Sequence, residues 1–306
     1  MRGTTRAHAT SICDLRRKRD MAGQQAANEV IKSRYQQSIA DYWNKEHSPV
    51  NIRLGDVDGL YHHHYGIGDV NQAALEATDA NSRHERIIAE LHRLESAQAG
   101  FLLDHLGDIQ PDDHLLDSGS GRGGTSFMAN RRFGCRVDGI SISQKQVDFA
   151  NQQAVDRGVS NRVRFHFRNM LDTWFEDARF KAVWNNESTM YVDLPPLFKE
   201  YRRIIRPGGR YLTITGAWNE EFGMPPEAVS LINARYGCNV HARSEYLSAL
   251  DAHGFQVLQV ENLTEQTLPY WKLRASSSVA TGVEEAFITA YEEGSFFYLL
   301  IAADRE

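Results

Sequence analysis

The residues with the clearest chemical signature are 114–124, which read His-Leu-Leu-Asp-Ser-Gly-Ser-Gly-Arg-Gly-Gly. The two leucines close a short apolar strand, and Gly119, Gly121 and Gly123 follow where the backbone must turn sharply into a helix. Such a turn brings a ligand close to bare backbone, as in the nucleotide sites of open α/β sheets. No Lys-Ser or Lys-Thr pair ends the motif, and the charge of Asp117 would repel a pyrophosphate group. The turn therefore predicts a ligand other than a bound phosphate chain.

A second candidate site follows a predicted strand that ends in Trp-Asn-Asn-Glu, with the glutamate at Glu187. The carboxyl ends of parallel strands meet at the ligand-binding edge of an open sheet, so we expect Glu187 to face the site. The same side chain could instead form an ion pair or cap a helix. A carboxylate among aromatic faces suits a reaction that passes through a carbocation and ends in proton loss. Two or three of the following aromatic residues are expected to line such a site: Trp184, Tyr191, Trp218, Phe222, Tyr236, Tyr270 and Trp271.

The turn sequence Asp-x-Gly-x-Gly resembles the first motif of class I S-adenosylmethionine methyltransferases. The resemblance implies that Asp117 and the backbone of Gly119 and Gly121 face the cationic amino-acid end of the cofactor. The stretch Ile-Ser-Ile-Ser-Gln-Lys-Gln is similar to the variant found in cyclopropane-fatty-acid synthases and sterol C-methyltransferases. In that variant, Ser143 and Gln146 would contact the ribose.

The remaining cofactor contacts follow from the same resemblance. Asn169 and Met170 resemble the adenine-edge motif, and an asparagine amide can still accept a hydrogen bond from the adenine amino group. Gln98 matches a glutamine that this subgroup uses near the carboxylate of the cofactor. Asp138 lies inside its strand, so it does not stand where the common ribose acid is expected. Agreement among these independent features predicts S-adenosylmethionine as the cofactor.

Longer stretches resemble the family of geranyl diphosphate C-methyltransferases. They are residues 50–68, 91–99, 184–194, 267–275 and 294–305, and with them the resemblance covers essentially everything after about residue 35. The family methylates carbon 2 of geranyl diphosphate and forms a carbocation at carbon 3, while a Mg²⁺ ion accompanies the diphosphate. The resemblance therefore implies 2-methylgeranyl diphosphate, a precursor of 2-methylisoborneol, as the product.

Roles for single residues follow from the resemblance, position by position. Glu187 would accept the proton, directly or through a water, and Tyr65 would position the substrate or relay that proton. Asn51 and Arg53 would meet the diphosphate, Asn51 through an oxygen suited to Mg²⁺. Tyr236 would stand at the cation-stabilising wall, where relatives have phenylalanine, and its added hydroxyl leaves the accepted chain length open. The other predicted substrate contacts are Trp184 and Tyr270.

Several alternatives stay open from the sequence. The chain could methylate another prenyl diphosphate, a sterol or a small nitrogen or oxygen nucleophile, or it could bind the cofactor without catalysis. The run from His62 to His64 suggests a zinc site, although neighbouring side chains point in different directions and metal ligands prefer one face. Arg243 and Arg274 are candidate phosphate partners or ordinary surface charges.

The elements that must position these residues follow from apolar spacing. Predicted strands close at residue 116 and span 136–140, 163–167, 180–184, 210–215, 256–263 and 296–302. Predicted helices span 29–45, ended by Pro49, and 84–106, 126–133, 143–157, 197–205, 246–253 and 282–291. This alternation favours an α/β fold, a mostly parallel seven-stranded sheet with helices on both faces, which the resemblance makes a Rossmann-like methyltransferase fold. We expect a disordered leader (1–28), a helical and loop cap (29–106) and a cofactor-binding core (107–306) with a lid insertion at about 219–242.

Composition sets the outer limits. The 306 residues are 42% hydrophobic and 24% charged, as in an ordinary globular protein. A net charge of −6 argues against a nucleic-acid partner, and no apolar run is long enough for a membrane span. Three cysteines without disulfide or metal spacing favour a reducing cytoplasm. We expect a small-molecule substrate and a homo-oligomer.

Overall fold

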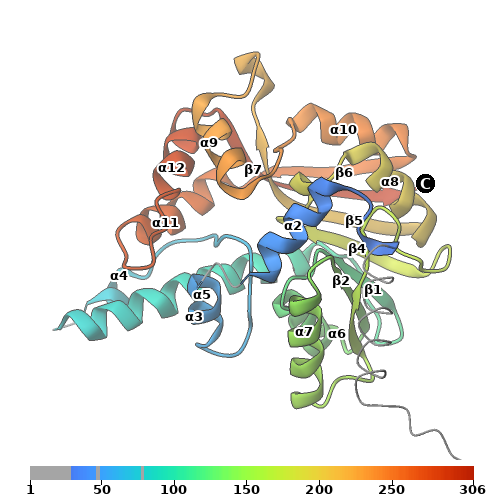
Figure 1. Ribbon diagram of the computed structural model, residues 1–306, viewed down its shortest axis with the longest axis horizontal. Coiled ribbons are helices and arrows are strands. Elements are labelled where there is room, and N and C mark those ends of the chain that lie inside the picture. The colour runs from blue at the N-terminus through green and yellow to red at the C-terminus, as the bar shows by residue number, and fades with distance from the viewer. Residues whose placement is uncertain (1–28, 46–48, 77–78) are drawn as a thin grey trace, which may run out of the picture.

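The computed structural model describes residues 29–45, 49–76 and 79–306 (Figure 1). The predicted leader, residues 1–28, lies outside the described residues. A seven-stranded sheet forms the centre, in the order β3-β2-β1-β4-β5-β7-β6. Strands β1 to β5 pair in parallel, and β7 runs antiparallel between β5 and β6, so the predicted mostly parallel sheet is confirmed. The strands are β1 (His114–Ser118), β2 (Arg136–Ser141), β3 (Val163–Phe167), β4 (Phe180–Asn186), β5 (Ile205–Trp218), β6 (Phe255–Asn262) and β7 (Phe296–Arg305).

The strand sequences explain why the sheet lies inside the protein. Leu115 and Leu116 follow each other in β1, and both are fully buried. Successive side chains of a strand point to opposite faces, and a parallel sheet is covered on both faces. Leu115 belongs to the same apolar cluster as Trp184, whereas Leu116 belongs to a second cluster with Val183. The sheet therefore separates two hydrophobic cores.

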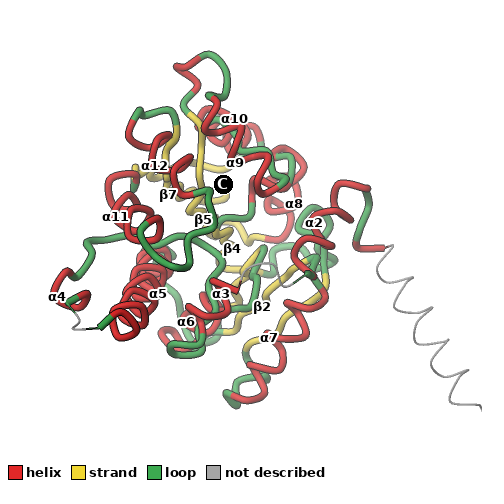
Figure 2. The backbone as a smooth tube through the Cα atoms, turned by 60° about the vertical axis from the view of Figure 1, so that its left-hand side comes forward, coloured by secondary structure: helices red, strands yellow, loops and turns green. Residues whose placement is uncertain are grey.

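Helices cover both faces of this sheet (Figure 2). Three of them contribute to the core of Leu115, namely α5 (Ala80–Asp104), α6 (Gly124–Phe133) and α7 (Gln144–Asp156). Two others contribute to the core of Leu116, namely α8 (Leu194–Ile204) and α10 (Arg243–Ala252). The apolar side of α8 shows the spacing of three and four residues that such a helix needs: Leu194, Leu197, Phe198, Tyr201 and Ile204.

The segment before the sheet contains α2 (Arg34–Asn44), α3 (Pro49–Gly55) and α4 (Gln72–Leu75). α2 packs against α7, whereas α3 and α4 contact α5. The prediction that Pro49 ends a helix is wrong, because Pro49 begins α3, where a proline costs no backbone hydrogen bond. α5 in turn contacts α6 and β5, so the end of the predicted cap rests on the core. The domain boundary at residue 106 stays a prediction.

The predicted lid contains α9 (Glu227–Tyr236), which packs against α12 (Glu284–Glu292). α12 also packs against α11 (Thr264–Ala275), and the three helices lie together beside β7 (Figure 1). The sequence did not predict α11, because Pro269 stands inside it and proline usually breaks a helix. Burial of Tyr270 and Trp271 on its inner side compensates for that proline.

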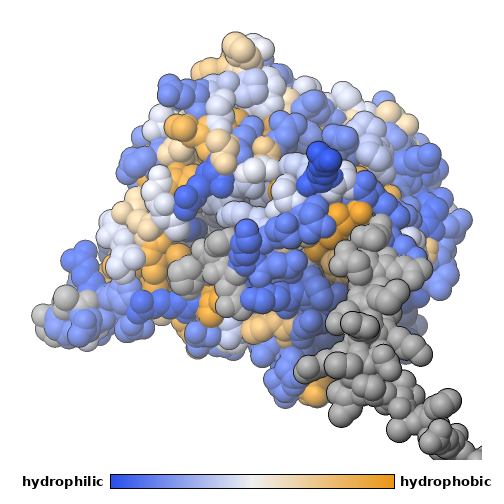
Figure 3. Space-filling view, in the orientation of Figure 1, coloured by the Kyte–Doolittle hydropathy of each residue, from blue (hydrophilic) through white to orange (hydrophobic). Residues whose placement is uncertain are grey.

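The surface in the view of Figure 1 is mainly hydrophilic, with small, separate apolar areas (Figure 3). Within the described part of the chain, no helix is both long enough and apolar enough to cross a bilayer. Ligands of open α/β sheets bind at the carboxyl edge of the parallel strands. In this protein the glycine turn lies at that edge, directly after β1.

Candidate active site

Two neighbouring cavities meet at the carboxyl edge of the parallel strands. The turn cavity lies over the glycine turn and is lined by residues such as Gly119, Ile140 and Met170. The cap cavity lies under the N-terminal segment and α9 and is lined by residues such as Asn51 and Tyr236. Both are lined by apolar side chains together with a few polar groups, as small-molecule sites usually are. Four residues line both cavities and form the boundary between them: Trp43, His63, Glu187 and Tyr191.

The turn cavity collects most of the residues predicted to bind the cofactor. Its wall comes from the carboxyl ends of β1, β2, β3 and β4 and the residues that follow them, together with α2 and His63. The contribution of α2 to the wall of the turn cavity consists of Gln36, Ile39 and Trp43. The predicted residues that line it are Gly119, Gly121, Gln146, Asn169 and Met170.

The glycines of the turn are required by close contacts as well as by backbone angles. Gly119 has φ +86°, and a Cβ there would lie 2.5 Å from the side chain of Ser188. Gly121 has φ +53°, and its Cβ would lie 2.9 Å from the His63 ring. Gly124 donates its N–H to the carbonyl of Tyr61 at 3.3 Å. The glycine turn thus leaves room for a ligand on one side and for the cap segment on the other.

Two predicted cofactor contacts lie behind the wall of the turn cavity. The Asp117 carboxyl group accepts a hydrogen bond from Ser126 Oγ at 2.6 Å, and burial raises its pKa to about 7. Gln98 is fully buried and forms an amide pair with Asn186, Nε2 to Oδ1 at 2.8 Å and Nδ2 to Oε1 at 2.9 Å. Neither side chain lines the cavity, so each supports residues that do. Direct contact of Asp117 and Gln98 with the cofactor stays a prediction.

Ser143 and Asn169 are tied to the N-terminal segment. Ser143 caps α7 and donates to Asn44 Oδ1 at 2.9 Å, and it does not line the turn cavity. Asn169 Nδ2 donates to the carbonyl of Val30 at 2.9 Å and to Gln36 Oε1 at 3.1 Å. The predicted ribose and adenine positions therefore also hold α2 in place over the cavity.

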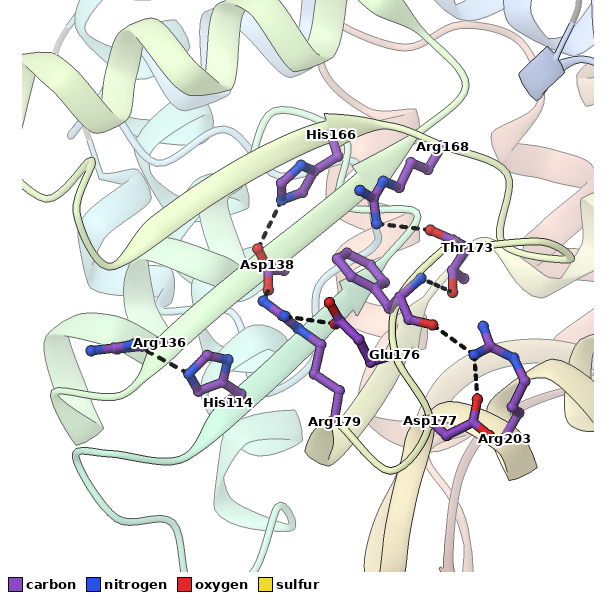
Figure 4. A network of polar contacts seen from close by, with 11 residues as sticks. His114, Arg136, Asp138, His166, Arg168, Thr173, Glu176, Asp177, Arg179 and Arg203 are labelled. Atoms are coloured by element: carbon purple, nitrogen blue, oxygen red, sulfur yellow. Dashed lines mark hydrogen bonds and ion pairs between the residues drawn. The ribbon is translucent and has the colours of Figure 1, made fainter.

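Asp138 is occupied elsewhere, which accounts for the missing ribose acid. Figure 4 shows its carboxylate between His166 Nε2, at 2.8 Å, and Arg179 Nη2, at 2.9 Å. These two partners hold the pKa of Asp138 below its usual range, although burial alone would raise it. Asp138 is a buried ion-pair partner between β2 and β3 and lines neither cavity.

Glu187 combines a strained backbone with a buried carboxyl group. Its backbone has φ +54°, a conformation that costs a non-glycine residue about 1–3 kcal/mol and persists mainly at functional sites. The Glu187 N–H donates to the carbonyl of Ile214 at 3.0 Å, which holds the strained turn. Burial raises the pKa of its carboxyl group to about 8, and the nearby Tyr298 hydroxyl acts in the opposite direction. Oε1 is buried without a hydrogen-bond partner. Glu187 can therefore exchange a proton near neutral pH.

Two tyrosines predicted to act near Glu187 also line the cap cavity. The hydroxyl groups of Tyr65 and Tyr236 are close enough to influence each other's pKa. The Tyr65 ring lies against Trp271 and Phe287, with centroid distances of 4.4 and 5.1 Å. Burial raises the pKa of both tyrosines, so both stay neutral. An apolar ligand in this cavity would meet neutral aromatic faces.

Positive charge gathers in the wall of the same cavity. The basic residues lining it are Lys45, Arg122, Arg235 and Arg274, of which Arg274 is paired with Glu284 at 3.0 Å. Asn51 stands in the wall too, and its amide group contacts His63 Nδ1 at 3.0 Å. This arrangement suits an anion at one side of an aromatic pocket. Sequence motifs did not single out Lys45, Arg122 or Arg235, since no spacing distinguishes such cations from surface charges.

Three predicted substrate contacts do not reach the cap cavity. Arg53 pairs with Glu85 at 2.7 Å and is half-exposed, because residues two apart on α3 cannot face the same side as Asn51. Trp184 is fully buried in the core of Leu115, one pleat below the edge of the sheet. Tyr270 lies one layer behind Tyr65, at a centroid distance of 6.4 Å. Its hydroxyl donates to Glu95 Oε1 at 2.8 Å. Of the seven aromatic candidates, Tyr191 and Tyr236 line the cavity.

The run of three histidines forms no metal site. His62 Nδ1 and His64 Nε2 lie 3.2 Å apart, whereas His63 points between the two cavities. Burial lowers the pKa of His63 to about 3 and of His64 to about 4, so both are neutral. Among the described residues, no group of three or more potential ligands could hold a metal ion. Of the other phosphate candidates, Arg243 lies over the Phe297 ring and outside both cavities.

Comparison with known proteins agrees with this geometry. A family model described as a methyltransferase domain matches residues 115–209. Geranyl diphosphate 2-C-methyltransferase of Saccharopolyspora erythraea is 58% identical over 278 residues, which is 91% of this chain and 97% of the relative. The enzyme of that name from Streptomyces coelicolor is 56% identical over 271 residues, 89% of this chain and 93% of the relative.

Solved structures match along the same length. The crystal structure of geranyl diphosphate C-methyltransferase from Streptomyces coelicolor, with Mg²⁺, geranyl-S-thiolodiphosphate and S-adenosylhomocysteine, has a TM-score of 0.89 and 55% identity. It covers 90% of this chain and 99% of that one. Identity this high, kept along nine-tenths of both chains, places this protein in the family of geranyl diphosphate C-methyltransferases.

Proposed function

We propose that this protein transfers a methyl group from S-adenosylmethionine to carbon 2 of geranyl diphosphate. The observation that carries the proposal is the position of Glu187 on the boundary between the turn cavity and the cap cavity. The methyl donor would occupy the turn cavity and the prenyl chain the cap cavity, with the reacting atoms meeting beside Glu187. A solved relative holds Mg²⁺, geranyl diphosphate and S-adenosylhomocysteine together, which supports one site for both ligands.

In the proposed reaction, methyl transfer is followed by proton loss to the Glu187 carboxylate. The electron pair of the double bond between carbons 2 and 3 forms the new carbon–methyl bond, and the bond from the methyl group to sulfur breaks. Carbon 3 becomes the cation. Glu187 then removes the proton from carbon 2, directly or through a water, and the double bond re-forms. The products are 2-methylgeranyl diphosphate, S-adenosylhomocysteine and a proton held by Glu187.

The side chains around Glu187 suit that intermediate. Tyr65, Tyr236 and Phe287 present aromatic faces to the cap cavity, and such faces stabilise a cation in a dry site. Because the pKa values of Tyr65 and Tyr236 are raised, neither hydroxyl supplies an anion that would trap the cation. The Tyr236 hydroxyl occupies space at this wall, so the chain length accepted is set in part by this residue.

The diphosphate end would meet the basic residues of the cap cavity. Lys45, Arg122 and Arg235 are the basic residues of the wall besides Arg274, and Asn51 would contact a Mg²⁺ ion held mainly by the phosphate oxygens. The donor set fits such an ion, because Mg²⁺ keeps several waters and needs only one or two protein ligands. Mg²⁺ would neutralise the diphosphate charge and fix its position.

One assay tests the proposal. The protein is incubated with S-adenosylmethionine labelled in the methyl group, Mg²⁺ and prenyl diphosphates of several lengths, and the products are identified by mass. We expect labelled 2-methylgeranyl diphosphate from geranyl diphosphate, loss of product with a chelator, and competition by inorganic pyrophosphate. If neither a chelator nor pyrophosphate changed the rate of product formation, the substrate would instead be a sterol or a small nucleophile, which needs no basic residues in the wall.

Two further expectations belong to this proposal. The cytoplasmic location predicted from cysteine usage is in keeping with Cys135 and Cys238, which are free thiols. The homo-oligomeric state stays a prediction. Light scattering on the purified protein would measure the number of chains.

A further inference from the structure

His63 lies on the boundary between the two cavities and is held there by its neighbours. Its ring meets the Trp43 ring edge to face, at a centroid distance of 5.6 Å. The ring also lies against the bare backbone of Gly121, where a Cβ would come within 2.9 Å of it. These contacts fix the position of the ring, so its two nitrogens keep the same neighbours.

Both nitrogens of the His63 ring face side chains that can donate a hydrogen bond. Arg122 Nη1 lies 3.0 Å from Nε2, and Asn51 Nδ2 lies 3.0 Å from Nδ1. A neutral imidazole has one N–H group and one acceptor nitrogen, so it can accept from only one of these donors at a time. An imidazolium ring could accept from neither. The two donors therefore compete for the one acceptor nitrogen of the ring.

The contact with Arg122 decides where the ring proton lies. A guanidinium group only donates, and a charge-assisted hydrogen bond is roughly twice as strong as a neutral one. While Arg122 binds Nε2, the proton must therefore lie on Nδ1. The Asn51 amide can adapt, because a half-turn about its last side-chain bond replaces Nδ2 by Oδ1, which accepts from Nδ1–H. The amide oxygen then faces His63, and the amide nitrogen is left for the cap cavity, which Asn51 lines.

An anion in the cap cavity would reverse this arrangement. Arg122 lines that cavity, and phosphate oxygens attract a guanidinium group more strongly than a neutral imidazole nitrogen does. When Arg122 turns to the anion, Nδ1 can release its proton to water and Nε2 can take one up. Nδ1 then accepts from Asn51 Nδ2, which leaves Oδ1 for the cavity. An amide oxygen is a ligand that suits Mg²⁺.

We propose that His63 is a positioning residue that couples the anion contact of Arg122 to the orientation of the Asn51 amide through the position of its one ring proton. The inference rests on the function proposed above, since the anion is the diphosphate group of the substrate. The Asn51 oxygen becomes available to a metal ion only after the anion has engaged Arg122. We therefore expect the diphosphate and Mg²⁺ to bind together rather than the metal ion first.

NMR locates the ring proton directly, at one fixed pH and without metal or turnover. Protein labelled with ¹⁵N in histidine is compared with His63→Gln, in which the His63 signals are missing. The ¹⁵N chemical shifts then distinguish the protonated nitrogen from the bare one. In the free protein we expect at least about tenfold more Nδ1–H than Nε2–H. Saturation with inorganic pyrophosphate should make Nε2–H the major form.

Two variants test the role of Arg122 without a ligand. Arg122→Met removes the donor, so the proton should move to Nε2. Arg157→Met is the matched control, because that arginine donates to the carbonyl of Gly59 and lines neither cavity. It should leave the proton on Nδ1. A proton on Nε2 in the free wild type, or one that stays on Nδ1 in Arg122→Met, would overturn the proposal. If Arg122→Met fails to fold, the wild type with and without pyrophosphate decides.

A binding measurement tests the consequence for the metal ion. His63→Phe keeps a flat ring and removes both nitrogens, so the Asn51 amide loses the partner that orients it. By calorimetry, the affinity for the complex of Mg²⁺ with pyrophosphate should fall about tenfold, and that for pyrophosphate alone by less than about threefold. Equal losses in both affinities, or no loss in either, would overturn the coupling.

Failure of this inference is distinct from failure of the proposed function. If pyrophosphate binds to the wild type and the ring proton stays on Nδ1, the coupling is wrong and the proposed function stands. If the wild type forms no methylated product from geranyl diphosphate, the proposed function is wrong. The ring proton in the free wild type and in Arg122→Met then still decides whether Arg122 sets the tautomer of His63.

Discussion

The turn cavity and the cap cavity share Glu187 but are built in different ways. The turn cavity takes much of its wall from residues at and just after the ends of four parallel strands, at 119–121, 140–142, 169–170 and 186–188. Two of its positions are bare glycine backbone. The cap cavity takes its wall from side chains as far apart in the chain as Asn51 and Arg274. A site made of strand ends is encoded in short motifs, whereas a site made of distant side chains depends on tertiary packing.

Replacing Glu187, which lines both cavities, should give the largest difference between methyl transfer and cofactor binding. Glu187→Gln keeps the shape of the side chain and cannot accept a proton, so we expect methylated product to fall by about 10²–10⁴-fold. The affinity for S-adenosylmethionine should stay within about twofold, because an amide at this boundary leaves the glycine turn intact. Product formation is followed by mass and cofactor binding by calorimetry. Full turnover in this variant would reject the assignment of Glu187 as the base.

A change in the glycine turn should affect the turn cavity first. Gly119→Ala places a methyl group 2.5 Å from Ser188 and forces alanine to φ +86°. Strain of about 1–3 kcal/mol would weaken S-adenosylmethionine binding by roughly 10–100-fold. The matched control is Gly100→Ala on α5, where a Cβ meets no atom within 4 Å. Calorimetry with the cofactor alone measures both variants, and equal affinities would contradict the steric role of Gly119.

The pH dependence concerns the boundary between the cavities. The buried Glu187 carboxyl group has a pKa raised to about 8, so it is protonated below that pH and becomes a base above it. Activity should therefore rise with pH, about tenfold from pH 7 to 9, and level off beyond. Initial rates at saturating substrate give the profile. A rate that is flat from pH 6 to 9 would show that proton removal by Glu187 does not limit turnover.

The central strands of the sheet were predictable because they contain short apolar runs. Leu115 and Leu116 illustrate the rule, since a strand covered on both faces carries no polar alternation. The helices were harder to predict near proline. Pro49 begins α3, where a proline costs no backbone hydrogen bond, and Pro269 lies inside α11 beside the buried Tyr270 and Trp271.

The candidate site divides along the same line. Gly119, Gly121 and Met170 were found because each stands just after a predicted strand. Gln98 and Trp184 were placed at ligands, but they lie in the layer behind, where burial and hydrogen bonding hold the residues that do line a cavity. A shift of one position along a strand or helix changes the face on which a side chain lies. Local sequence spacing does not show whether that side chain lines a cavity or lies behind its wall.

Replacing Arg53 has the smallest expected effect and tests whether its side chain contacts the diphosphate. The family resemblance places it at the diphosphate, whereas the structure pairs it with Glu85 at 2.7 Å, outside the cap cavity. Exposed ion pairs contribute about 0–1 kcal/mol. Arg53→Ala should therefore lower the free energy of unfolding by less than about 1 kcal/mol and change kcat/KM by less than about fivefold. Asn51→Ala, two residues away on the other side of α3, should raise the Mg²⁺ concentration needed for half-maximal activity. A loss in Arg53→Ala as large as in Asn51→Ala, measured by Mg²⁺ titration, would show that α3 turns when substrate binds and brings Arg53 to the phosphates.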